Sequence, residues 1–378
     1  MRIVVVIPTY NERVNTEKMI ATLAGVFSQI KNHEMNLLYV DGNSPDGTGD
    51  AVKKKQEQYK WLHLVAETEK EGLGMAYAKG MQYAMDRLAA DYIMEFDGDF
   101  QHRPEDLPLL VREIDNNYDY IIGSRYVPGG SIPSEWGFDR KFLSVVGNLV
   151  ARILLILPKI HDVTTGFKLA RVKGFMDRFD FSALLSKSFA YKVHLLFYMV
   201  NKGARVKEVP IRFMARASGE SKIIKNEMKE TLRVIFLLQL HNPKLQKFFK
   251  FGTVGLLGFL VNFIGLRLFR RFGFPEILSW LFSTELAIIN NYTLNNFWTF
   301  KEAKIAGVKN TVIKFFQFNL TSAGALAIQS IFGPLGVKLI GIKYDWLVLA
   351  FVVALMVLPY NWLMYNTFIW RKKASNPK

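Results

Sequence analysis

The chain has 378 residues, of which 50% are hydrophobic and 22% are charged. This composition excludes an intrinsically disordered chain, and the absence of cysteine excludes disulfides, thiolate metal sites and cysteine nucleophiles. The formal net charge is +16, and 16 basic but only 4 acidic side chains follow position 240. Because the positive charge flanks the most apolar part of the chain, it predicts contact with a lipid bilayer and no nucleic-acid partner.

The first 215 residues alternate short apolar runs with helical patterns. Runs rich in Val, Ile and Leu occur at 3–7, 37–40, 92–96 and 120–122. This alternation is typical of an α/β domain with a mostly parallel, Rossmann-like sheet covered on both faces. Open sheets of this kind bind ligands beyond the carboxyl ends of their strands. We therefore expect the functional residues in the segments that directly follow these runs.

Polar segments follow three of the runs, with the sequences PTYNE (8–12), DGNSPDG (41–47) and DGD (97–99). The two carboxylates of the third segment stand at a strand end, and Gln101 offers another oxygen nearby. Carboxylate and amide oxygens are the ligands that hard divalent cations such as Mg²⁺ or Mn²⁺ prefer. Such a cation would neutralise a diphosphate leaving group.

Residues 140–157 have the pattern of an amphipathic helix, and a second amphipathic helix with a linker is expected at 221–245. In the first, apolar residues keep helical spacing while polar residues repeat at intervals of four. Such a helix is suited to lying on a membrane surface, although it could instead pack its apolar side on the domain with a solvated polar face. The apolar positions are Phe142, Val146, Leu149 and Ile153, and the polar stripe is Arg140, Ser144, Asn148 and Arg152.

The last third contains four long segments of low charge, at 251–266, 275–297, 315–337 and 346–370. Only the second contains acids, Glu276 at its start and Glu285 within it. A hydrocarbon core roughly 30 Å thick requires about 20 helical residues, so these segments predict a four-helix transmembrane domain. Buried helices of a large soluble core are the alternative. An even number of spans places both ends on one side. Basic residues are more numerous on the side of the first domain, which predicts an integral protein of the cell membrane with that domain and both termini cytoplasmic.

Six short motifs occur in an order found in one family. They are PTYNE (8–12), DGNSPDGT (41–48), KEGLG (70–74), DGDFQH (97–102), GSRY (123–126) and GESK (219–222). As a set they resemble dolichol-phosphate mannose synthases, which are inverting glycosyltransferases of the GT-A fold. The resemblance implies a catalytic domain at 1–220 that includes the first amphipathic helix. Residues 246–378, notably NYTLNNFWTF (291–300), resemble a GtrA-like membrane domain.

The resemblance also implies roles for individual residues in binding the donor, a metal ion and the acceptor. Two departures from the family pattern concern the base and the sugar: Gly42 stands where a second Asp is frequent, and Lys192 and His194 stand where Gln and Glu are common. The implied donor-binding residues are Pro8, Tyr10, Glu12, Asp41 and Lys70, with Arg216 and Lys222 closing on the phosphates. The implied metal and diphosphate ligands are Asp97, Asp99 and Gln101, and the acceptor phosphate would meet Arg125, Arg140 and Ser144.

The activity implied by the resemblance is metal-dependent, inverting transfer of mannose from GDP-mannose to dolichyl or another polyprenyl phosphate. Two alternatives stay open: transfer of glucose or another sugar from a UDP donor, and a membrane half that translocates lipid-linked sugars with the first domain as its regulator. A processive polysaccharide synthase resembles the same fold but typically carries Gln-x-x-Arg-Trp, which is absent from this sequence.

Overall fold

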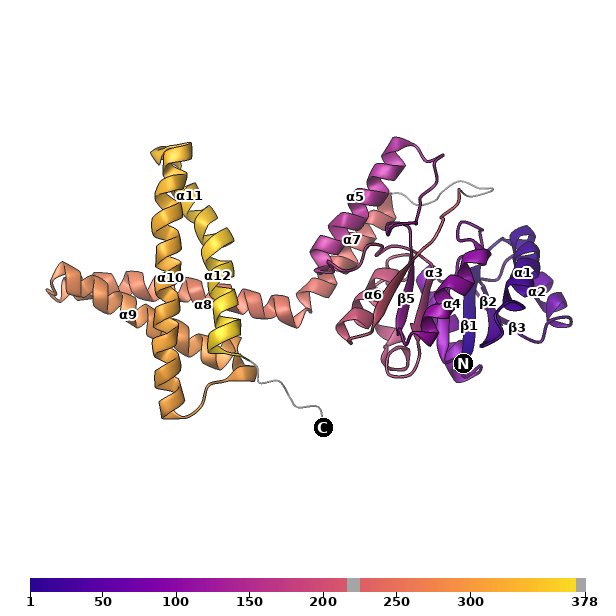
Figure 1. Ribbon diagram of the computed structural model, residues 1–378, viewed down its shortest axis with the longest axis horizontal. Coiled ribbons are helices and arrows are strands. Elements are labelled where there is room, and N and C mark those ends of the chain that lie inside the picture. Colours follow the sequence, from indigo (N-terminus) through magenta and orange to yellow (C-terminus); the bar gives the residue numbers. More distant parts are fainter. Residues whose placement is uncertain (216–224, 372–378) are drawn as a thin grey trace. The chain divides into compact units, whose positions relative to one another are not determined.

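The computed structural model describes residues 1–215 and 225–371. Arg216 and Lys222, for which the sequence predicts a role at the donor phosphates, lie outside the described residues. The chain forms two compact units, Met1–Gln239 and Leu240–Lys378, and each is described by itself (Figure 1).

The first unit is built on a seven-stranded sheet with the strand order β3-β2-β1-β4-β6-β5-β7. Strand β6 is antiparallel to its neighbours β4 and β5, and all the other neighbouring pairs are parallel. This architecture confirms the predicted mostly parallel α/β fold. The strands are β1 (Arg2–Thr9), β2 (Glu34–Asp41), β3 (Leu62–Ala66), β4 (Tyr92–Glu95), β5 (Tyr120–Ser124), β6 (Lys168–Arg171) and β7 (Val206–Pro210).

Helices cover both faces of this sheet, which explains why its strands are apolar without alternation. Successive side chains of a strand point to opposite faces, so Val4 and Val6 of β1 belong to one core and Ile3, Val5 and Ile7 to the other. The helices of the first unit are α1 (Arg13–Phe27), α2 (Thr48–Gln56), α3 (Leu73–Asp86), α4 (Leu107–Asp115), α5 (Phe138–Leu155), α6 (Tyr191–Asn201) and α7 (Lys225–Leu240).

Helix α5 is the first predicted amphipathic helix, and its polar stripe faces the protein. Asn148 is buried; its Nδ2 donates to the carbonyl of His161, and its Oδ1 accepts from the backbone N–H of Val163 at 2.9 Å. The apolar side chains of Phe142 and Ile153 are exposed by 53% and 65%. The alternative, an apolar side packed on the domain under a solvated polar face, is therefore wrong for this helix.

Helix α7, the second predicted amphipathic helix, lies next to α5 (Figure 1). The side-chain amide of Gln239 donates to the carbonyl of Leu154. Val234 and Ile235 are buried in the core beside α5, while Phe236 is 63% exposed. Both helices thus present apolar side chains on the outside of the first unit.

The second unit consists of long helices, as predicted. Within the described residues, three of them are long and apolar enough to cross a membrane: Leu245–Arg271, Val308–Ile340 and Leu347–Ile369. The remaining predicted span forms a helix at the expected place, but Glu285 and a pair of Asn residues make it less apolar, so its crossing stays a prediction. The helices are α8 (Pro243–Arg271), α9 (Glu276–Leu294), α10 (Val308–Ile340), α11 (Asp345–Val352) and α12 (Leu358–Met364), with π-helical turns at Asn295–Thr299, Val353–Val357 and Tyr365–Ile369.

Small residues allow α8 and α9 to pack closely. A Cβ at Gly258 would collide with the side chain of Asn291, and one at Gly265 would lie 3.3 Å from Cβ of Ser283. Close approach of this kind is how helices associate in bilayers, where no hydrophobic force drives them together. Because α9 pairs with a helix long enough to span, we expect it to cross the bilayer with α8.

The NNFWTF segment closes one end of the second unit. Phe300 stacks on Trp370 with 4.5 Å between ring centroids and an interplanar angle of 5°. Asn296 is buried, and its Oδ1 accepts from the backbone N–H of Ile305 at 2.8 Å and from Nε1 of Trp370 at 3.0 Å. This motif therefore has a structural role, because it joins the ends of two helical hairpins.

The close packing of α3 on the sheet gives a stability prediction at Gly80. A Cβ there would lie 2.5 Å from Cγ1 of Val6 and 2.8 Å from Cγ2 of Val40. We expect Gly80→Ala to destabilise the first unit by about 1–3 kcal/mol through overpacking, and to lower the thermal unfolding midpoint of the purified full chain, measured by circular dichroism. Gly25→Ala on α1 is the control, because nothing lies within 4 Å of its Cβ position, and it should stabilise by roughly 0.5–1 kcal/mol. Equal midpoints for the two variants would contradict the packing argument.

Candidate active site

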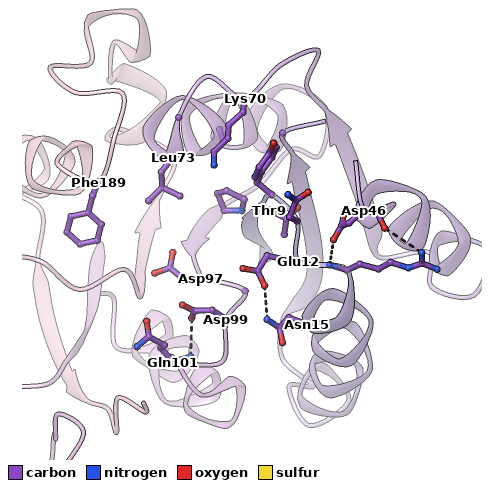
Figure 2. A pocket seen from close by; sticks show the side chains of 18 of the residues that line it. Thr9, Glu12, Asn15, Asp46, Lys70, Leu73, Asp97, Asp99, Gln101 and Phe189 are labelled. Atoms are coloured by element: carbon purple, nitrogen blue, oxygen red, sulfur yellow. Dashed lines mark hydrogen bonds between the residues drawn. The ribbon is translucent and has the colours of Figure 1, made fainter. Parts of the chain in front are cut away.

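A cavity of about 880 Å³ opens at the carboxyl ends of the sheet's strands (Figure 2). This is the edge at which the sequence predicts the functional residues. Most of its walls come from the segments that follow β1, β2, β3 and β4, and residues of α1, α3, α5 and α7 and the loop before α6 contribute the rest. The lining residues are Pro8, Thr9, Tyr10, Asn11, Glu12, Arg13, Val14, Asn15, Gly42, Asp46, Glu67, Lys70, Gly72, Leu73, Ala76, Asp97, Gly98, Asp99, Gln101, Arg140, Phe189 and Glu227.

Most of the described residues with a predicted role line this one cavity. Their contacts with a ligand stay predictions. Three predicted residues, Asp41, Arg125 and Ser144, do not line it. Those that line it are Pro8, Tyr10, Glu12, Lys70, Asp97, Asp99, Gln101 and Arg140.

The loop after β4 places Asp99 and Gln101 together on one wall. Figure 2 shows them close to each other, with the backbone N–H of Gln101 donating to Oδ1 of Asp99 at 3.1 Å. Nε2 of Gln101 donates to the carbonyl of Met214 at 3.4 Å. Phe100, between the two, has a φ of +60°, a left-handed conformation that costs a bulky residue about 1–3 kcal/mol. This unusual backbone turns two oxygen-bearing side chains onto the cavity wall.

Asp97 is held by an internal cation. Nζ of Lys192, on α6, lies 3.3 Å from each carboxylate oxygen of Asp97, and the hydroxyl of Tyr77 donates to Oδ1 at 2.9 Å. The side chain of Lys192 is completely buried. A Cβ at Gly166 would collide with both partners, so the absence of a side chain at this position permits the ion pair.

The ion pair determines the charge state of this part of the site. Burial raises the pKa of Asp97, but the ammonium of Lys192 and the hydrogen bonds from Tyr77 and Lys192 are among the effects that together outweigh burial, so the pKa lies below its usual value. Burial lowers the pKa of His102, whose Nε2 is 3.7 Å from Asp97, to about 3. His102 is therefore neutral at physiological pH. Asp97 is ionised, and Lys192 supplies its countercharge.

Arg125 lies in a buried pair. Its Nε and Nη2 donate to the carboxylate of Asp162 at 2.8 and 2.7 Å, and Nη2 also donates to the hydroxyl of Thr164 at 2.8 Å. The side chains of Arg125 and Asp162 are 9% and 0% exposed. Most of the guanidinium is thus committed to the protein, and its contact with an acceptor phosphate stays a prediction.

Arg140 and Ser144 lie one turn apart on α5 but have different surroundings. The guanidinium of Arg140 lies 4.1 Å from the ring centroid of Trp136 and borders the cavity. The hydroxyl of Ser144 is hydrogen-bonded to the hydroxyl of Tyr126 at 2.6 Å. Of the three predicted acceptor residues, Arg140 is the one that lines the cavity, and its contact with an acceptor phosphate stays a prediction.

Asp41 shapes the loop after β2. Its carboxylate accepts from the hydroxyl of Ser44 at 2.6 Å and from the backbone N–H of Ser44 at 3.0 Å. Asp41 is buried and lies 3.4 Å from the hydroxyl of Thr9. Its contact with the nucleoside stays a prediction.

Sequence reasoning missed three charged residues of this region, Glu67, Asp162 and Glu95. Glu67 directly follows β3, so the rule that ligands bind past strand ends could have found it. Asp162 and Glu95 carry no such signal, because their importance comes from the buried partners Arg125 and Tyr191.

Comparison with known proteins agrees with the two units. Residues 4–179 match the family described as Glycosyl transferase family 2, and residues 250–370 match the GtrA/DPMS transmembrane domain. A dolichol-phosphate mannosyltransferase of Pyrococcus furiosus is 34% identical over 330 residues, which are 85% of this chain and 88% of that protein. An undecaprenyl-phosphate mannosyltransferase of Micrococcus luteus is 37% identical over 59% of this chain and 88% of its own. A polyprenol monophosphomannose synthase of Mycolicibacterium smegmatis is 36% identical over 61% and 84%.

The fold, the cavity and the two matching domains define a membrane glycosyltransferase. The chain belongs to the dolichol-phosphate mannosyltransferase family, within glycosyl transferase family 2, and carries a GtrA/DPMS transmembrane domain. The resemblance that the motifs indicate is confirmed.

The Lys192 ion pair predicts a shifted pH profile. Lys192→Met removes the charge that helps to keep the pKa of Asp97 low, so burial should raise this pKa, and the carboxylate should take up a proton at higher pH. As pH falls, sugar transfer by the variant should therefore decline at a higher pH than in the native enzyme. The initial rate between pH 4.5 and 8.5 tests this. Lys202→Met, an exposed lysine after the same helix, should leave the profile unchanged, and coinciding profiles for the native and Lys192 proteins would contradict the assigned role.

Proposed function

We propose that this enzyme transfers mannose from GDP-mannose to a polyprenyl phosphate, with inversion at the anomeric carbon. The observation that carries the proposal is a single cavity with Asp99 and Gln101 on one wall and Arg140 on its border. The wall with Asp99 and Gln101 suits a nucleoside diphosphate with a divalent cation. The guanidinium of Arg140 suits the phosphate of an acceptor. The named activities of the relatives support mannose as the sugar and a polyprenyl phosphate as the acceptor.

The chemistry of the acceptor agrees with the residues of the cavity. A phosphate monoester carries about 1.5 to 2 negative charges at pH 7, so it attacks without a general base. One of its oxygens forms the new bond to the anomeric carbon while the bond from that carbon to the diphosphate breaks, and GDP leaves. The protein must hold and orient the acceptor, and the planar guanidinium of Arg140 is suited to phosphate oxygens.

Asp99 and Gln101 fit a site for Mg²⁺ or Mn²⁺. Mg²⁺ is commonly bound by one or two carboxylates together with substrate phosphates, so the protein needs to supply few ligands. In the described ranges, no group of three or more His, Cys, Asp or Glu residues could hold a metal ion. We therefore propose that phosphate oxygens of the donor nucleotide complete the coordination of the cation. When bound, the cation would neutralise the negative charge that develops on the departing diphosphate.

The acceptor is a lipid, and the first unit has a suitable surface for it. Arg140 stands near the start of α5, the helix whose apolar side chains Phe138 and Phe142 are 79% and 53% exposed. A helix of this kind resting on the bilayer would hold Arg140 at the depth of the lipid phosphate. We propose the cytoplasmic face and cytoplasmic termini, which require α9 to be the fourth span.

A donor panel tests the proposed activity. With purified full-length enzyme, radiolabelled GDP-mannose, UDP-glucose and UDP-galactose are each supplied with a polyprenyl phosphate and Mg²⁺ or Mn²⁺. We expect a mannolipid from GDP-mannose, its loss in EDTA and its recovery with excess metal. Asp99→Ala should lower the rate at least about a hundredfold, because it removes a charged ligand. A product from a UDP sugar alone would contradict the donor, and full activity in EDTA would contradict the metal site.

Arg140 gives a separate prediction for the acceptor. Arg140→Ala loses a charge-assisted pair worth about 1.5–3 kcal/mol, so kcat/KM for the lipid should fall roughly tenfold to a hundredfold while donor affinity is unchanged. Arg140→Lys should rescue only partly, because it lacks the planar fork. Arg152→Ala is the control, since that side chain donates to the carbonyl of Pro158 at 3.1 Å and does not line the cavity. Equal losses at the two positions would assign Arg140 to general attraction of anionic lipids.

A further inference from the structure

One end of the cavity is formed by residues that follow β1, β2 and β3, namely Tyr10, Gly42, Glu67 and Lys70. In the sheet order these strands lie on one side of β4, from whose end Asp97 and Asp99 extend. Three strand spacings separate β3 from β4, or about 14 Å along the edge. Figure 2 shows Lys70 across the cavity from Asp99 and Gln101. A nucleoside diphosphate with its phosphates at Asp99 would extend its base toward this end.

The base end has a gap beside Gly42. A Cβ at that position would lie 3.5 Å from Cδ2 of Tyr10, 3.6 Å from Oε2 of Glu67 and 3.6 Å from Cβ of Lys70. Gly42 does not have a positive φ, so its backbone conformation does not require glycine. What the glycine provides at this position is the space that a side chain would fill. The gap is therefore the size of one methyl group, and Tyr10, Glu67 and Lys70 surround it. Nζ of Lys70 lies 4.0 Å from the ring centroid of Tyr10. A gap of this size can take the amino group at the edge of a base that lies in the cavity.

The carboxylate of Glu67 has a fixed orientation. Its side chain is 2% exposed, and Oε1 accepts from Nζ of Lys79 at 2.7 Å while Oε2 is directed toward Gly42. Lys79 also bonds to Glu71 at 2.6 Å. Glu71 does not line the cavity, so of the two acids on Lys79 only Glu67 faces the place of a base.

We infer that Glu67 selects guanine in the donor nucleotide. Guanine presents its N1–H and the adjacent amino group on one edge, and Oε2 of Glu67, the oxygen that is not bonded to Lys79, can accept from the amino group. Uracil presents a single N–H between two carbonyl oxygens, which a carboxylate repels. A site built to bond such donors rejects a base that lacks them, because the carboxylate is left without its partners. This inference rests on the proposed function, in which the donor is a nucleotide sugar.

Nucleotide binding by the purified full-length protein tests the inference, measured by titration calorimetry with Mg²⁺ and the diphosphates of guanosine, inosine, xanthosine and uridine. The native protein should prefer GDP over IDP, which lacks the amino group, and over UDP by roughly tenfold or more. Glu67→Gln should lose this preference and bind XDP better than GDP, because the amide oxygen should stay on Lys79 while the amide nitrogen donates to the oxygen that replaces the amino group. Glu71→Gln removes the other acid from Lys79 and should bind like the native protein.

The outcomes separate this inference from the proposed donor. A native protein that prefers UDP would overturn both. A native protein that prefers GDP, with an unchanged ratio of GDP to IDP affinity in Glu67→Gln or an equal change in Glu71→Gln, would overturn the role of Glu67 alone.

A second variant covers the case in which Glu67→Gln fails to fold. Gly42→Ala adds a methyl group that makes only ordinary contacts of 3.5–3.6 Å, so the fold should persist while the gap for the base narrows. GDP affinity should fall at least about fivefold, and UDP affinity should change less, because uracil is smaller. Unchanged GDP affinity in a folded Gly42→Ala protein would show that the base lies elsewhere.

Discussion

The ion pair between Asp97 and Lys192 joins three parts of the first unit at the wall of its cavity. Asp97 follows β4, Lys192 lies on α6, and Gly166 precedes β6 and leaves the space in which the pair forms. An unpaired carboxylate beneath the cavity would be strongly penalised by burial. With Lys192 as its countercharge, the DGD loop can hold ionised oxygens on the cavity wall without a metal ion.

The side of the cavity at which we propose the acceptor depends on a second buried network, which fastens α5 to the sheet. Asp162 binds Arg125, and Asn148 holds the backbone on either side of Asp162, at His161 and Val163. The polar stripe of α5 is used for this attachment, so the apolar side chains of Phe142, Leu149 and Ile153 on the opposite side point away from the domain. One arrangement therefore gives the helix an apolar surface for a bilayer and brings Arg140 to the cavity.

Much of this organisation could be predicted from the sequence, because its signals are local. An apolar run followed by PTYNE or DGD identifies a buried strand and the polar segment at its end, whatever the rest of the chain does. The periodicity of α5 and the long uncharged segments after residue 245 are equally local. The order of the six motifs along the chain also indicates the family. In the described residues, most of the predicted donor and metal ligands line one cavity.

Periodicity shows that α5 has two sides, but it cannot say which side meets the protein, because Asn148 bonds to a loop that only folding brings near. The countercharge of Asp97 comes from a residue 95 positions away, and the partner of Arg125 is 37 positions away. Such pairs leave no pattern in the chain, since they arise when neighbouring elements close a buried space. The sequence alone determined the strands, the helices and the chemical groups at their ends. Only the tertiary structure decided which of those groups are committed to one another and which line the cavity.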